Sequence, residues 1–401
     1  MHRTIPRRPF ILLAAFLVAL PAPPAAAQGR PFTVDDLLRR ERLGGIAAAP
    51  DGRMLAVVVR RGMEGETAMR PEMAGYDHAD LWMVPLPSGE PRRITGGARE
   101  GGGVLLPAWS PDGRRVAFFS TDGGDNLRAY AWDREGGRVR RLSERGIDFA
   151  ASGRMAWVDD RRVLLALLPD GEQPDLFRQQ TQTRDTARTA WARQEAGREA
   201  TASVLESGAP QPQLPPGPLT LVDVASGASR TVAEGRFVQV SVAPGGRFAI
   251  VLAETGWTQP GARLNDAGTV SARFGVVPLD GAGPVRWVEA LSDVRGQVLP
   301  LSWSPTGDRV AVVAAPARGA AALYVVAAAD GAAAPVAVGQ VAPEEVRWSR
   351  GGRLLVRGRA PGAERAEWWA VAMEGSAAPV AITRGVASLP AQLWEAPCEG
   401  R

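Results

Sequence analysis

Lysine, cysteine and histidine are scarce in this chain of 401 residues, and each scarcity excludes a class of function. All 47 basic residues are arginines. Three of them lie in the first eight residues, and without these the formal net charge of +4 falls to about +1. The chain therefore lacks the one-sign charge bias of a nucleic-acid-binding protein.

The single cysteine, Cys398, has no partner for an internal disulfide. Structural zinc sites draw on several cysteines and histidines together. Only two histidines are present, His2 and His78. We therefore expect neither a metal nor a cofactor.

Long apolar runs are also absent, with one exception near the start. The run Phe10 to Leu20 follows Arg3, Arg7 and Arg8, and the sequence Ala25 to Gln28 offers a small-residue cleavage site. This order is typical of an export signal, and the run is too short for a comfortable membrane span. We expect cleavage after Ala27 and a periplasmic or secreted protein. The arginine pair fits a twin-arginine signal and the hydrophobicity fits the general secretory route.

A short helix is predicted at the start of the mature chain. In the segment Phe32 to Arg40, Thr33 and Asp36 have the spacing of a capping box, with acidic residues first and basic residues last. We expect residues 28–45 to lead into the main domain.

A turn phrase recurs along the rest of the chain. Its clearest copy, Trp109 to Phe119, places Ser-Pro-Asp-Gly between a tryptophan and a run of β-branched and aromatic residues. Serine, proline and glycine suit successive positions of a type I turn, so the phrase predicts a hairpin. Weaker and stronger copies give six turn positions: Gly52, Gly113, Asp160, Gly246, Gly307 and Gly352.

A second hairpin follows each phrase, as in Leu81 to Thr95, where a Gly-containing turn separates two strands. Two hairpins make four strands, and such units of about 45 residues predict an all-β fold, a β-propeller of six to seven four-stranded blades. We expect the propeller at 46–383, with an insertion at 171–218. Residues 384–401 would then begin a seventh repeat, from Leu389 to Trp394, or form a linker.

The longest connections all lie between second and third strands: Arg61 to Ala79, Gly171 to Pro218 and Thr255 to Ala272. They should share one face of the propeller, opposite the Ser-Pro-Asp-Gly turns, and loops on a rigid scaffold often bind ligands. We expect a helix at Asp185 to Arg198 in the longest insertion. The binding-face candidates are Tyr76, His78, Trp191 and Trp257.

These phrases resemble exported members of the prolyl oligopeptidase family, in the acylaminoacyl-peptidase and dipeptidyl-peptidase branch. The resemblance is carried by Phe32 to Leu38, Pro50 to Arg53, Trp109 to Arg114 and Leu219 to Thr231. It covers the N-terminal propeller of that family, and TolB-like propellers share the motifs. It implies serine peptidases whose propeller filters access to a C-terminal α/β-hydrolase domain.

The chain departs from that family in the catalytic residues. It contains no Gly-x-Ser-x-Gly elbow, and His78, between Asp77 and Asp80, has no serine context. We therefore expect no catalytic residue and an absent hydrolase half. The repeated aspartates should serve turns, because a sialidase box would place its glycine one position later. The repeated tryptophans should pack between blades.

Two functions remain open. The chain is either a substrate-gating propeller of a prolyl-oligopeptidase-type peptidase, or a free-standing TolB-like propeller that binds a protein or peptide. We also expect the apolar side of the sixth blade to lack a neighbour, so that the protein either associates through the face near Trp368, Trp369 and Trp394 or is marginally stable.

Overall fold

The structure is a computed structural model. It describes residues 30–62, 78–96, 102–121, 126–149, 151, 155–198, 215–258, 269–281, 283–296, 298–316, 319–373 and 378–386. The expected signal, Tyr76 and the segment Leu389 to Trp394 lie outside these residues. Every absence stated below refers to the described part of the chain.

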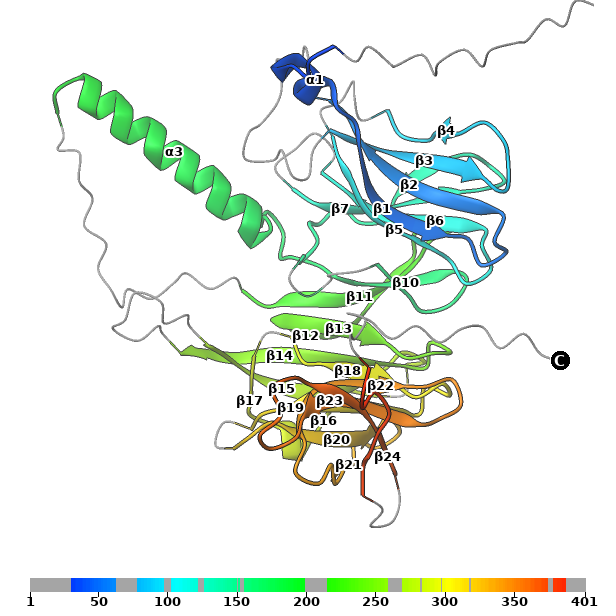
Figure 1. Cartoon of the computed structure of the whole chain (residues 1–401). Coiled ribbons are helices and arrows are strands. Elements are labelled where there is room, and N and C mark those ends of the chain that lie inside the picture. Colours follow the sequence, from blue (N-terminus) through cyan, green and yellow to red (C-terminus); the bar gives the residue numbers. More distant parts are fainter. Residues whose placement is uncertain are drawn as a thin grey trace, which may run out of the picture.

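The described chain forms six antiparallel sheets, each with four strands in sequence order and one additional strand in the fourth sheet (Figure 1). We call these sheets the first to the sixth blade. The strands of the first three blades are β1 Arg42–Ala48, β2 Met54–Arg60, β3 Ala79–Pro85, β4 Arg92–Arg93; β5 Val104–Trp109, β6 Arg115–Ser120, β7 Arg128–Asp133, β8 Val139–Arg141; β9 Ala156–Trp157, β10 Arg162–Ala166, β11 Gly217–Asp223, β12 Ser229–Gly235.

The strands of the last three blades are β13 Phe237–Val242, β14 Phe248–Thr258, β15 Thr269–Pro278, β16 Arg286–Trp287, β17 Val294–Arg295; β18 Leu301–Trp303, β19 Arg309–Ala314, β20 Ala322–Ala327, β21 Ala333–Pro335; β22 Ala342–Trp348, β23 Leu354–Arg359, β24 Glu367–Val371, β25 Val380–Ala381. A short 3₁₀ helix, η2, covers Glu289–Leu291. The six radial four-stranded sheets confirm the predicted β-propeller.

The recurring turn phrase connects the first strand to the second strand of its blade, as predicted. In the second blade the Gly113 N–H donates to the Ser110 carbonyl at 2.9 Å, and Gly113 has a φ of 69°. This positive φ is the reason for glycine at the last position of the turn. The carboxylate of Asp112 accepts hydrogen bonds from the Ser110 hydroxyl at 2.6 Å and from the Arg114 N–H at 3.0 Å. The repeated aspartate therefore serves the turn.

Neighbouring blades pack face to face through buried apolar side chains. Each of the five contacts between consecutive blades has its own hydrophobic cluster. Between the first and second blades, for example, Val58 and Leu81 pack with Val116 and Phe118, all at most 2% exposed. The repeated tryptophans Trp109, Trp157, Trp303 and Trp348 pack with these clusters, as predicted.

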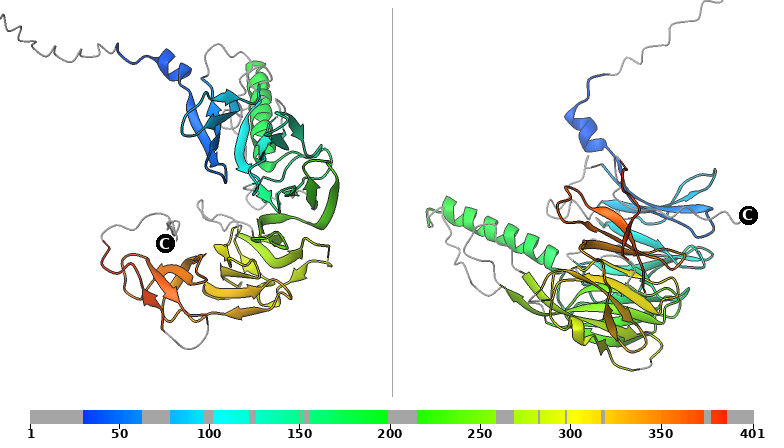
Figure 2. Two further views of the ribbon diagram at one scale, coloured as in Figure 1. Left: turned by 90° about the vertical axis from the view of Figure 1, so that its right-hand side faces the viewer. Right: turned by 60° about the horizontal axis from the view of Figure 1, so that its bottom comes forward.

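The blades follow an arc, and the ribbons of the first and sixth blades do not meet (Figure 2, left). No hydrophobic cluster among the described residues joins these two blades. Trp368 and Trp369 are themselves 0% and 8% exposed, but Val380 and Ile382 beside them are 63% and 47% exposed, so apolar side chains are exposed near the two tryptophans, as predicted. Trp394 lies outside the described residues.

The lead-in helix α1, Val34–Arg39, has the predicted capping box. The Asp36 N–H donates to the Thr33 hydroxyl, and the Thr33 N–H donates to the Asp36 carboxylate at 2.9 Å. Hydrogen bonding by Arg30 lowers the pKa of Asp36 to about 2. No residue of α1 is buried, so the helix is held mainly by local interactions.

Candidate functional site

The long connections reach the propeller face opposite the turn phrases. Adjacent strands are antiparallel throughout, so the connections after the second strands lie at the other end of each blade from the turns. The longest described element on this face is helix α3, Asp175–Glu195. It begins ten residues before the expected start at Asp185, because Pro174 at its N-cap provides no side-chain cap that the sequence could reveal.

Helix α3 projects away from the blades, with only its base held by the propeller (Figures 1 and 2). Phe177 at the base is 2% exposed and belongs to the cluster between the second and third blades. Trp191, near the far end, is 69% exposed. Isolated helices gain most of their stability from packing, so an exposed tryptophan on a projecting helix offers an unused contact surface.

A cavity of about 390 Å³ opens at the base of α3, between the third and fourth blades. Its lining combines the ends of strands with loops that precede the next blade. The apolar part consists of Phe149, Leu167, Leu168, Pro169, Pro174, Pro215, Phe237, Val238, Val270 and Val298. This volume suits a side chain or a short peptide segment.

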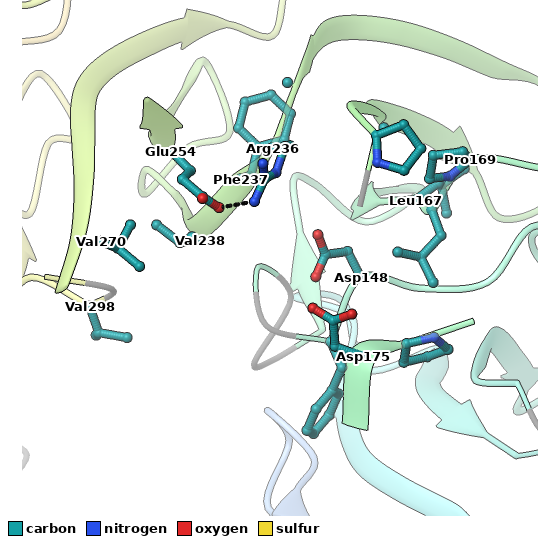
Figure 3. Close-up of a pocket in the computed structure, with 16 residues that line it drawn as sticks. Asp148, Leu167, Pro169, Asp175, Arg236, Phe237, Val238, Glu254, Val270 and Val298 are labelled. Atoms are coloured by element: carbon teal, nitrogen blue, oxygen red, sulfur yellow. Dashed lines mark hydrogen bonds and ion pairs between the residues drawn. The ribbon is translucent and has the colours of Figure 1, made fainter. Parts of the chain in front are cut away.

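Four charged side chains complete the lining. Asp148 and Asp175 lie on the side of the third blade and α3, and Arg236 and Glu254 lie on the side of the fourth blade (Figure 3). The Arg236 guanidinium is ion-paired with Glu254 at 2.5 Å, and the Glu254 N–H donates to the Arg236 carbonyl at 2.7 Å. Asp148 accepts from the Ala151 N–H at 3.3 Å. Asp175 is also ion-paired with Arg178 of the same helix, so three carboxylates and two guanidiniums lie at the cavity, and the excess of one negative charge favours a cation.

The structure does not bring the binding-face candidates together into this cavity. His78 is 5% exposed and has a φ of 58°, at the entrance to β3. Trp257 is partly buried at the end of β14 and packs against the cluster between the fourth and fifth blades. Trp191 is exposed on α3, and Tyr76 lies outside the described residues. None of the three candidates within the described residues lines the cavity.

Sequence reasoning missed the cavity residues because they come from seven separated segments. The sequence nevertheless held one indication of a site at this place. The Pro-rich stretch before β11 and the acidic start of α3 flank the longest insertion, where a ligand site on the loop face had been expected.

Two further observations limit the chemistry of the described residues. They contain no group of three or more histidine, cysteine, aspartate and glutamate side chains arranged to hold a metal ion. Nor do they include a helix with the length and apolar character needed to cross a membrane.

Known proteins with similar sequences or structures are peptidases and TolB proteins. No protein-family profile matches the sequence. The uncharacterized peptidase YuxL of Bacillus subtilis (strain 168) is 28% identical over 141 residues, which are 35% of this chain and 19% of that peptidase.

Among solved structures, a prolyl endopeptidase matches 86% of this chain at 14% identity with a TM-score of 0.49. Dipeptidyl peptidase 4 of Porphyromonas gingivalis matches 88% at 13% identity with a TM-score of 0.48. TolB of Acinetobacter baumannii matches 81% at 12% identity with a TM-score of 0.35.

The chain spans 42% of the prolyl endopeptidase and 55% of the dipeptidyl peptidase. The fold assignment depends on the six sheets themselves. The comparisons report the same resemblance as the turn phrases, to proteins of the prolyl oligopeptidase family first and to TolB next.

Proposed function

We propose that this chain is a non-catalytic, exported propeller that binds segments of peptides or proteins through the face with the insertions. The cavity at the base of α3 is the observation that supports this proposal. It lies where the propeller scaffold is rigid and the connections are long, which is the usual arrangement for a binding site. The export signal expected from residues 1–27 supports a periplasmic or secreted location.

The lining indicates which peptide segment would bind. A basic group would face the carboxylates of Asp148 and Asp175, and an apolar neighbour would contact the wall that includes Val238 and Val298. The Arg236 charge is already matched by Glu254. The proposed ligand is therefore a segment in which an arginine, a lysine or a free amino terminus adjoins an apolar residue.

Helix α3 would provide a second contact with a larger partner. Its exposed Trp191 lies on the same insertion as the cavity wall at Pro215. Aromatic side chains are common anchors of protein interfaces. A folded partner, such as a hydrolase domain or an exported protein, could reach both Trp191 and the cavity.

The decisive experiment measures peptide binding to the purified chain. Peptides that contain a basic and an apolar residue would be selected on an array, and their affinity measured by calorimetry. Val298 is 69% exposed at the cavity, so Val298→Arg should fold normally while placing a cation beside the ligand's own. We expect at least about tenfold weaker binding, which corresponds to about 1.4 kcal/mol.

The matched control is Val380→Arg, at a valine that is 63% exposed on the last strand of the sixth blade. It should leave the affinity unchanged. Equal losses in both variants, or wild-type affinity in Val298→Arg, would contradict binding in the cavity.

A further inference from the structure

The fourth blade contains the two longest strands that the structure describes, β14 and β15. The inference drawn from them rests on the proposed function, because it concerns how a peptide lies at the cavity. Pairing between β13 and β14 ends at Phe237 and Ala253, but β14 continues to Thr258. On this side of β14, no strand of the described residues pairs with residues 255–258, which we call the open edge.

The opposite side of this extension is regular sheet. Beyond a bulge at Thr255, β14 pairs with β15 as far as Thr258 and Thr269. On the far edge of β15, β17 pairs with it, and the Gly296 N–H donates to the Val270 carbonyl at 3.0 Å. The open edge is therefore already extended, and a strand can add to it without a rearrangement of the blade.

Other blades end their second strand differently. In the first, second and sixth blades, the first strand pairs with the second strand up to its last residue, which is Arg60, Ser120 and Arg359, respectively. These blades have no corresponding extension. The fourth blade is built with a second strand that outruns the first.

The third blade shows how a position of this kind is filled. Its first strand, β9, pairs with β10 only as far as Leu164. Beyond that pair, Ile147 pairs antiparallel with Leu167, and the Asp148 N–H donates to the Ala166 carbonyl at 2.9 Å. A short segment from outside the four strands thus lies in line with β9. It occupies the position that is open in the fourth blade.

The cavity at the base of α3 borders the open edge. Glu254, just before the edge, and Val270, which pairs with Trp257 of the edge, both line the cavity. Strand β12 ends at Gly235, so the chain reaches β13 from the third blade through Arg236, and both of these residues line the cavity too. The cavity therefore lies where a continuation of β13 along β14 would run.

A strand in line with β13 directs alternate side chains to two different walls. In β13 itself, Phe237 belongs to the cluster with the third blade, whereas Val238 packs against the cluster with the fifth blade. At the cavity, the third-blade side carries Asp148 and Asp175, and the fifth-blade side carries Val298 (Figure 3). Two adjacent side chains of one extended segment would thus meet a carboxylate wall and an apolar wall.

We propose that the peptide binds in the cavity as an added strand, antiparallel to β14 along the open edge, in the way that Ile147 and Asp148 pair beyond β10. Its backbone exchanges hydrogen bonds with alternate residues of the edge, and its side chains supply the specificity. A basic side chain points toward Asp148 and Asp175, and the adjacent apolar side chain points toward Val298. The ligand is therefore an extended basic–apolar segment, and a helix with the same side chains does not fit.

Backbone methylation of the peptide tests the added strand. The probe is a peptide with a basic and an apolar residue whose affinity is lost in Val298→Arg. It is resynthesised with one N-methyl group at each position in turn, and calorimetry measures each affinity. Alternate N–H groups of an added strand face the edge, so methylation at alternate residues should weaken binding at least about tenfold, and methylation at intervening residues less than about threefold.

Equal losses at all positions, or no loss at any, would overturn the added strand and leave the peptide-binding function standing. If no peptide binds the purified chain, the proposed function itself fails, and the added strand fails with it.

Hydrogen exchange of the protein provides an independent measurement. Saturating peptide should slow the exchange of alternate amides within residues 255–258 at least about tenfold, because peptide carbonyls accept from them. The amides of β22, residues 342–348, do not line the cavity and serve as the control with unchanged exchange. Binding that leaves the open edge unprotected would overturn the proposal.

Double-mutant cycles between protein and peptide test the two walls. Asp175 and Val298 are 54% and 69% exposed, so Asp175→Asn and Val298→Ala should fold normally. Replacing the peptide's basic residue should be non-additive with Asp175→Asn, and replacing its apolar residue non-additive with Val298→Ala. The two crossed pairs should be additive. Coupling of equal size in the crossed pairs would overturn the assignment of adjacent side chains to opposite walls.

Discussion

The first and sixth blades have the same four-stranded architecture, yet one ends the arc with an apolar face and the other with a charged one. Leu43 and Ile46 are largely exposed on the first blade. On the sixth blade, Glu344 and Glu345 form ion pairs with Arg347, Arg357 and Arg359.

This difference concerns the outer faces of the two terminal blades, which have no neighbouring blade among the described residues. Terminal repeats of elongated proteins need a polar outer face to remain soluble. The sixth blade has such a face, with arginine side chains 41% to 59% exposed, so each ion pair contributes less than about 1 kcal/mol. The charges therefore matter for which surfaces can associate and contribute little to folding stability. The first blade has no such polar outer face, so its exposed apolar face is expected to contact another surface.

Removing the charges from the sixth blade should produce the largest effect. In the triple variant Glu345→Leu, Arg347→Leu and Arg357→Leu, the ion pairs at the centre of this face are removed. Both ends of the arc then become largely apolar, and one molecule can pack head to tail on the next. Such heterologous contacts do not close and can grow into filaments. We expect the average mass measured by sedimentation velocity to rise with protein concentration, whereas the wild-type mass stays constant.

The control for this prediction removes two arginines from the turn of the same blade, Arg350→Leu and Arg353→Leu. These side chains are exposed in the phrase between β22 and β23, outside the sheet face. A monomeric Glu345/Arg347/Arg357 variant, or equal association of the control, would show that the charged face does not prevent association.

Sequence could predict the blades because their signals are local. The turn phrase combines residues whose backbone preferences agree, and Gly113 adopts the positive φ that the phrase requires. The capping box of Thr33 and Asp36 is also local, and it is present. Alternation in β22 and β23 held the signal for the charged face, in Glu345, Arg347 and Arg357.

Sequence could not predict the cavity because its residues meet only through the arc. Asp148 precedes β9, Glu254 lies on β14 and Val298 precedes β18. Within its own segment, the sequence around each of these residues is typical of an ordinary loop or strand and does not indicate a binding site. The helix start at Asp175 was missed for a related reason, since Pro174 provides no side-chain cap that a sequence pattern could reveal.

The two ends should also differ in acid sensitivity. In the first blade the Arg53 N–H donates to the Asp51 carboxylate at 2.9 Å, which lowers the pKa of Asp51, and Arg134 of the second blade adds an ion pair at 3.0 Å. The sixth blade has Gly351 at the equivalent position, so its turn has no such carboxylate.

A lowered pKa means that the ionised carboxylate favours the folded state. Its contribution is complete above the ordinary pKa of about 3.9 and is lost as the pH falls through the folded-state value. Asp51→Asn should therefore lower the denaturant midpoint at neutral pH, and this difference should shrink at about pH 2 to 3. Gly351→Asn, which places the same amide in the sixth-blade turn, should have an effect that is the same at both pH values. An Asp51→Asn effect that is independent of pH would exclude the charge as its cause.

The smallest expected effect compares tryptophans in the first and last packed interfaces of the arc. Trp109 donates its indole N–H to the Ala47 carbonyl at 3.0 Å, whereas the buried indole N–H of Trp348 has no hydrogen-bond partner among the described residues.

The substitution Trp→Phe removes similar ring area at both positions. At Trp109 it also removes a hydrogen bond worth about 1 kcal/mol, and at Trp348 it removes an unsatisfied donor. Trp109→Phe should therefore lower the free energy of unfolding by about 1 kcal/mol more than Trp348→Phe. Urea unfolding with equal slopes for both variants measures this difference, and equal losses would show that the indole bonds do not distinguish the two interfaces.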